Sequence, residues 1–243
     1  MDFQTGLRLW RIGNAVSCFG VVQFVVLTGL AMHYYPKDYS LFADFLSDLG
    51  RTTCSGKPNA VSAMLFNGSL ALLSVSLIPF FWFLPLHAAD RARLLRIVSY
   101  FGFASCAALV GIAIWPYDTH PSEHMLALFY WLMLMLAISA LHCIALLSSK
   151  QAFSILGLLS LGLFLMIAAF IIRGLAFGAA EETVVAQKCL VGYSLAWFIV
   201  FSYRAARSED LELPFIDSEL DKMANDYIDR VCGTGSRDKD VGR

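Results

Sequence analysis

The chain alternates between long apolar segments and short polar connections. Six segments are apolar enough to cross a bilayer, whose hydrocarbon core requires about 20 such residues in a helix. They cover residues 12–33, 60–86, 97–115, 125–148, 153–172 and 189–203. A helix satisfies its own backbone hydrogen bonds, and hydrocarbon offers no other partner for them. The pattern therefore predicts an all-α fold, a polytopic membrane bundle of six transmembrane helices.

The first apolar segment also resembles a signal peptide, because Arg8 and Arg11 precede it. Its apolar run is longer than the about 7–15 residues of a signal peptide's apolar region. We therefore expect a retained membrane helix. The sixth segment is the shortest and contains Ser194 and Ser202, which makes its pattern the weakest of the set.

Lysine and arginine are distributed unevenly between the two ends of this predicted bundle. One end carries Arg8, Arg11, Arg91, Arg93, Arg96, Lys150, Arg204 and Arg207. The other end carries Lys37, Arg51, Lys57, Arg173 and Lys188. Since basic residues favour the cytoplasmic side, we expect both termini to be cytoplasmic. The loops at 34–59, 116–124 and 173–188 would then be external.

The composition agrees with a membrane protein and excludes one class of partner. The chain is 58% hydrophobic and 15% charged, whereas soluble domains are about 45–50% apolar and about 25% charged. The net charge is −1, and the sequence has no basic stripe of the kind that binds nucleic acid. We expect membrane lipids as partners and no nucleic acid.

Residues 39–50, with the sequence YSLFADFLSDLG, have the spacing of a short amphipathic helix. Such a helix is too short to span a bilayer, so we expect it to lie at the interface in the first external loop. Asp44 and Asp48 are four residues apart and would project from the same face. That face is either solvated or turned toward the bundle, where two close carboxylates favour a shared proton or a bound cation.

The stretch WPYDTHPSEH, residues 115–124, is rich in titratable groups. Pro121 is suited to the first position of the fourth helix, which places His120 near its N-cap and His124 one turn further along. Asp118 could add an oxygen ligand, and zinc takes about three or four such ligands. The alternatives are proton transfer, binding of a polar headgroup, or a capped helix start.

These two stretches predict a site for a divalent metal, zinc or calcium. The candidate metal ligands are Asp44, Asp48, Asp118, His120 and His124. The candidate catalytic residues are Asp48, Asp118 and His124. Asn67 and Arg173 are candidates for substrate binding; the alternatives are a helix-bridging amide and a snorkelling arginine.

From Ser208 the composition becomes charged and polar, which indicates a boundary between residues 1–207 and a cytoplasmic tail at 208–243. Residues 217–233 have one apolar side and predict a short amphipathic helix, followed by a disordered end. This tail could bind a protein partner.

Two motifs carry a resemblance to a known family. FLSDLG, followed by NAVSAMLFN and later by GIAIWPYDTHPSEH, resembles the membrane family called domain of unknown function 998, which is grouped with DRAM-like and FGF-receptor-activating membrane proteins. The resemblance covers about residues 10–205. The matching residues are Ser47, Asp48, Gly50, Asn67, Pro116, Asp118 and His124. The resemblance implies six helices and supplies no established activity.

The leading functional hypothesis is a metal-dependent membrane lipid hydrolase, since metal-bound water can be deprotonated near neutral pH. The layout is distantly similar to membrane lipid hydrolases that bind zinc, but the chain lacks the late-helix HxxxH pair of those enzymes. The alternative is a non-catalytic membrane protein that binds lipid or a partner. Ion-coupled transport is a third hypothesis, although no ionisable residue lies at mid-membrane.

Overall fold

The computed structural model describes residues 3–87, 91–147, 155–177 and 181–207. Six helices in these residues are long and apolar enough to cross a membrane. They are α1 (Phe3–His33), α2 (Ala60–Phe83), α3 (Ala92–Ile114), α4 (Pro121–Leu147), α5 (Ile155–Phe177) and α6 (Glu181–Arg207). The predicted six-helix membrane bundle is therefore confirmed, and the predicted tail helix lies outside the described residues.

Helices α1, α3, α4 and α6 begin before the apolar segments that predicted them, whereas α2 ends at Phe83, before the expected residue 86. The differences are large in α1, which begins at Phe3 where the apolar pattern indicated Ile12, and in α6, which begins at Glu181 where the pattern indicated Cys189. Backbone hydrogen bonding continues past the hydrocarbon core, where polar side chains reach water. Apolar length therefore identifies each span but does not determine where its helix begins and ends.

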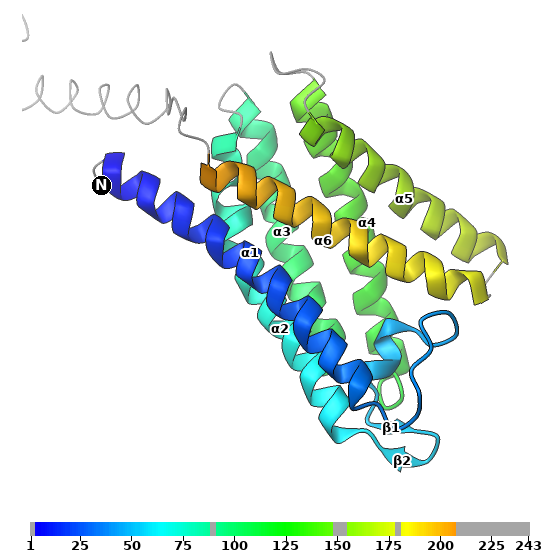
Figure 1. Cartoon of the computed structure of the whole chain (residues 1–243). Coiled ribbons are helices and arrows are strands. Elements are labelled where there is room, and N and C mark those ends of the chain that lie inside the picture. Colours follow the sequence, from blue (N-terminus) through cyan, green and yellow to red (C-terminus); the bar gives the residue numbers. More distant parts are fainter. Residues whose placement is uncertain (1–2, 88–90, 148–154, 178–180, 208–243) are drawn as a thin grey trace, which may run out of the picture.

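The six helices form a ring in which each helix packs against its neighbours in sequence, and α6 packs against α1 (Figure 1). The start of α1 and the end of α6 lie at the same end of the ring (Figure 1). There the Trp10 Nε1–H donates a hydrogen bond to the Ala205 carbonyl over 2.9 Å. The polar loop at 34–59 lies at the other end, which we call the loop face.

Neighbouring helices approach closely through small residues and interhelical hydrogen bonds, as membrane helices do. Ser17 Oγ and Gln23 Nε2 of α1 donate to the carbonyls of Ser76 and Ser69 in α2, each over 2.9 Å. A Cβ at Gly20 would lie 2.3 Å from Ser76 Cβ. Glycine at this position therefore sets the separation between α1 and α2.

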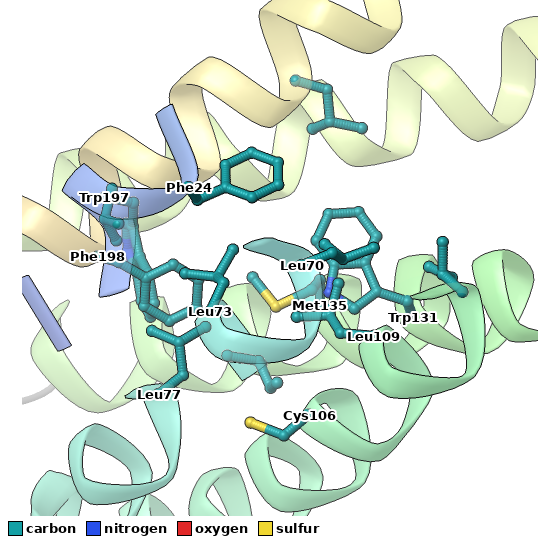
Figure 2. Packing of buried hydrophobic residues seen from close by; sticks show 14 of the residues in the cluster. Phe24, Leu70, Leu73, Leu77, Cys106, Leu109, Trp131, Met135, Trp197 and Phe198 are labelled. Carbon is teal, nitrogen blue, oxygen red and sulfur yellow. The ribbon is translucent and has the colours of Figure 1, made fainter. Parts of the chain in front are cut away.

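Large side chains fill the ring's interior away from the loop face. Trp197 packs against Phe80 and Phe198 with ring centroids 5.7 and 4.9 Å apart. Its Nε1–H donates to Ser160 Oγ over 3.0 Å, which links α6 to α5. Figure 2 shows Trp197 and Phe198 beside apolar side chains that converge from α1, α2, α3 and α4.

The first loop contains less helix than expected. A 3₁₀ helix, η1, covers only Leu46–Gly50, so Asp44 and Asp48 do not share one helical face. The Asp44 carboxylate accepts the Ser40 N–H, and the Asp48 carboxylate accepts the Phe45 N–H. These local bonds compete with a continuous helix.

A short hairpin follows η1 and pairs β1 (Thr53–Cys54) with β2 (Lys57–Pro58). Its two turn residues, Ser55 and Gly56, both have positive φ, at 50° and 76°. This is the geometry of a type I′ turn, the tight connection that suits twisted hairpins. The hairpin therefore holds the chain between η1 and α2 in a defined path.

Candidate functional site

Asp118 anchors this hairpin to the turn between α3 and α4. Its carboxylate accepts hydrogen bonds from the Thr52 N–H at 3.0 Å, the Thr52 hydroxyl at 2.7 Å and the Thr53 N–H at 3.0 Å. Burial raises the pKa of Asp118, but the bonds from Thr52 and Thr53 outweigh it and hold the pKa below its usual value. Asp118 is thus an ionised anchor for the loop.

The other two carboxylates are neutralised separately within the loop. Asp44 lies 2.7 Å from Lys37 Nζ, and Asp48 lies 3.0 Å from Arg51 Nε. Burial raises the pKa of Asp44, while the Lys37 ammonium and the Ser40 N–H lower it, with a net decrease. Each carboxylate therefore has its own cation, and the two do not form a shared acidic pair.

His120, just before α4, and His124, in the first turn of α4, lie in different surroundings. His120 is exposed, and its Nδ1 lies 2.9 Å from Thr119 Oγ1. His124 is only 4% exposed, and its Nδ1 lies 2.8 Å from the Trp115 carbonyl oxygen. A carbonyl oxygen only accepts hydrogen bonds, so the proton of this contact is on Nδ1.

The predicted metal-ligand set is not assembled in the part of the chain that the structure describes. No group of three or more His, Cys, Asp or Glu side chains there could hold a metal ion. The predicted ligands were Asp44, Asp48, Asp118, His120 and His124. Loop amides, hydroxyls and cations engage the three carboxylates separately, so one convergent metal site stays a prediction without support from the described residues. The geometry also gives no support to catalysis by Asp48 or Asp118.

Asn67, a candidate for substrate binding, instead holds η1 against α2. Its Nδ2 donates to the Gly50 carbonyl over 2.9 Å. A Cβ at Gly50 would lie 2.4 Å from Asn67 Oδ1, so this contact depends on glycine. The other candidate, Arg173, is half-buried in α5 and is not among the residues that line the cavity described next.

A cavity of about 90 Å³ lies inside the ring beneath η1. Its apolar wall contains Phe24, Leu46, Phe66, Leu70, Leu73, Leu77, Leu109, Ile112, Leu128, Trp131, Val191, Leu195 and Phe198. Its polar lining residues are Ser47, His124, Gln187 and Ser194. Figure 2 shows several of the apolar residues, from Phe24 of α1 to Leu109 of α3 and Trp131 of α4, directed toward a common interior.

The polar lining is concentrated toward the loop face. Ser47 belongs to η1, while His124 and Gln187 lie near the starts of α4 and α6. Ser194 lies deeper, and its hydroxyl donates to the Leu190 carbonyl of its own helix. Leu77 and Phe198 lie further along their helices and line the deeper part. The cavity is therefore amphipathic along its length.

Gln187 also connects η1 to α6, a role that the sequence analysis missed. Its Oε1 accepts the Leu46 N–H over 3.0 Å, and the neighbouring Lys188 Nζ donates to the Asp44 carbonyl. Gln187, Val191 and Ser194 follow helical spacing, which places them on one face. The sequence signal that could have identified Gln187 was its position on the same helical face as Val191, which lines the cavity.

A second hollow of about 430 Å³ lies between α3 and α4. Its lining includes Ala107, Gly111 and the exposed side chains of Ile114 and Tyr130. Among the described residues that line it, none is charged. Because it lacks the buried polar end of the first cavity, the first cavity is the stronger candidate site.

Comparisons with protein-family models, with curated proteins and with solved structures find no match to this chain. The resemblance to the family called domain of unknown function 998 therefore stays a prediction. The function has to be inferred from the geometry of the site.

Proposed function

We propose that this membrane protein binds a lipid non-catalytically, with part of an apolar chain in the cavity and the 34–59 loop as its cover. The observation that carries this proposal is the amphipathic cavity, which is apolar at depth and polar at the loop face. An amphipathic ligand matches this arrangement, because its chain avoids water while its polar end finds hydrogen-bonding groups.

The cavity's volume limits how much of the ligand it encloses. Pockets that bury drug-sized molecules measure about 300–1,000 Å³, and an apolar cavity of about 150 Å³ binds benzene. A cavity of about 90 Å³ therefore suits a segment of a chain. Leu128, Val191 and Leu195 are half-buried lining residues of α4 and α6, and we place the rest of the ligand beside these side chains.

The hydrolase hypothesis has less support from the geometry. Metal-dependent hydrolysis requires several ligands around one ion, whereas the described carboxylates hold the loop through separate contacts. A structural role for Asp44, Asp48 and Asp118 fits a cover that remains in place over a bound lipid. This arrangement supports lipid binding without catalysis.

We place the loop face on the external side and both termini in the cytoplasm. The end opposite the loop face carries Arg8, Arg11, Arg91, Arg93, Arg96 and Arg204. At the loop face, Lys37 and Arg51 are paired with carboxylates. The basic excess at the other end supports a cytoplasmic location.

A cavity-filling substitution tests lipid binding directly. Leu70 lines the cavity and is 6% exposed, whereas Leu72 of the same helix is 55% exposed. We expect Leu70→Trp to reduce cross-linking of a photoactivatable 16-carbon alcohol at least about fivefold, because the indole fills the space that the chain would occupy. Leu72→Trp should retain the cross-linking, which is quantified by peptide mass spectrometry of the purified full chain.

A second pair of variants keeps the proposal testable if Leu70→Trp does not fold. Val191→Phe adds bulk at a half-buried lining position, and Val185→Phe adds it at a position 37% exposed on the same helix. Size-exclusion chromatography confirms that each variant is folded. Unchanged cross-linking in both folded cavity variants would refute binding in this cavity.

A further inference from the structure

The polar end of the cavity presents hydrogen-bonding groups whose directions can be deduced from their existing partners. The Leu46 N–H only donates, so the Gln187 atom 3.0 Å away from it is the amide oxygen. This leaves the Gln187 NH₂ group as a donor for a ligand. The hydrogen bond from Leu46 of η1 thereby determines which end of the Gln187 amide is available to a ligand.

His124 offers the complementary group, a hydrogen-bond acceptor. Its Nδ1 donates to the Trp115 carbonyl over 2.8 Å, so Nε2 is the ring nitrogen that remains for a ligand. In a neutral imidazole with hydrogen on Nδ1, Nε2 is an acceptor. His124 is 4% exposed and lines the cavity together with Gln187.

The cavity lining also limits the charge of a ligand. Among the described lining residues, none is a lysine, arginine, aspartate or glutamate. The nearby Lys188 donates to the Asp44 carbonyl, outside this lining. A phosphate or carboxylate brought into the cavity would lose water without gaining a counter-ion, which is costly.

We propose that the polar end of the bound lipid is an uncharged hydroxyl group, which donates to His124 Nε2 and accepts from the Gln187 amide. This inference rests on the proposed lipid-binding function and specifies its ligand class, a neutral lipid alcohol. A hydroxyl is matched to this pair because it donates and accepts at one atom. An ester or ether oxygen only accepts, and so leaves His124 Nε2 without a donor.

Three probes with the same photoactivatable 16-carbon chain test the inference on the purified full chain. They are the primary alcohol, its methyl ether and its phosphate monoester. We expect the alcohol to bind about threefold to tenfold more tightly than the ether, the ratio that one net hydrogen bond provides. The phosphate monoester should bind most weakly.

A conservative histidine variant separates hydrogen bonding from packing. In His124→Asn the amide nitrogen takes the place of Nδ1 and donates to the Trp115 carbonyl, while Nε2 is lost. We expect this variant to bind alcohol and ether equally. His120→Asn, which changes the exposed histidine of the same turn, should keep the preference for the alcohol.

The possible failures are distinguishable. If the native chain binds the ether or the phosphate monoester as tightly as the alcohol, and Leu70→Trp weakens all three, the hydroxyl inference is overturned and lipid binding in the cavity stands. If the folded Leu70→Trp and Val191→Phe chains bind every probe as the native chain does, the proposed function itself fails.

Discussion

At the scale of single residues, Asp118 shows why the acidic groups of this chain do not gather around a metal. A carboxylate near a loop can bind a cation, a proton or backbone N–H groups. The Thr52 and Thr53 N–H groups at the start of the short hairpin both donate to Asp118. Charge-assisted bonds of this kind are stronger than neutral ones, so local donors hold the carboxylate.

Replacing Asp118 by Asn should loosen the hairpin. The Asn side chain keeps one acceptor oxygen, but its NH₂ group cannot accept a hydrogen bond from Thr52 or Thr53. We expect faster hydrogen exchange at Thr52 and Thr53 and a loss of about 1 kcal/mol, below the usual value for bonds to a charged group because Asp118 is exposed. Asp38→Asn, an exposed change in the same loop, should leave both amides protected.

The same anchor should weaken in acid. Because the folded pKa of Asp118 is lowered, its contribution is complete above the ordinary aspartate pKa of about 3.9. It is lost as pH falls through the lower folded pKa. The protection of the Thr52 and Thr53 amides against hydrogen exchange, relative to their intrinsic rates, should therefore decrease in that acidic range in the native chain. Protection that does not change with pH would contradict the role of Asp118.

At the scale of elements, the sequence predicts the helices better than the loop. Apolar length identifies the spans because no unpaired backbone survives in hydrocarbon. The η1 region could not be predicted in the same way, since Asp44 and Asp48 accept N–H groups of Ser40 and Phe45 and so shorten a helix that residue spacing favoured. Topology did predict that this loop meets the turn containing Asp118.

The cavity was beyond prediction for a related reason. Leu70 and Leu72 are chemically identical and two positions apart, and only the ring geometry decides which one lines the interior. Similarly, the sequence shows Gln187 only as a polar side chain near the start of a helix. The structure shows that its amide oxygen accepts the Leu46 N–H. Such assignments require the relative rotation of the helices.

The α1–α2 contact provides a test of helix packing. Gly20→Leu would place a side chain where a Cβ already lies 2.3 Å from Ser76 Cβ. We expect a loss of about 1–3 kcal/mol from overpacking, measured as a lower thermal midpoint in detergent. Gly29→Leu is the matched control, since a Cβ at Gly29 meets no atom within 4 Å, and an equal loss in both variants would refute the packing argument.

At the scale of the whole molecule, the 34–59 loop lies at one end of the ring, the loop face (Figure 1). Asp118 binds this loop through Thr52, and the cavity's hydrogen-bonding end meets it through Ser47 and Gln187. The opposite half of the interior is filled by aromatic side chains such as Trp197. A ligand would therefore approach from the loop face or between the helices near it.

The proposed orientation can be tested on intact cells. In a background that carries Cys189→Ser and Cys232→Ser, Ser55→Cys places a thiol at the exposed hairpin turn, and Arg93→Cys places one at the opposite end. We expect a membrane-impermeant maleimide to label only the Ser55→Cys chain before lysis, and both chains after permeabilisation. Labelling of Arg93→Cys alone in intact cells would reverse the orientation.

The contact between α1 and α6 has a consequence for biosynthesis. Trp10 and Ala205 are separated by 195 residues, and ribosomes add about 5–20 residues per second. The first helix thus waits roughly 10–40 s after its own synthesis before its last neighbour exists. During that interval the side of the first helix that later contacts α6 is open to other membrane helices or to an insertion chaperone, so assembly of this protein is vulnerable until the ring closes.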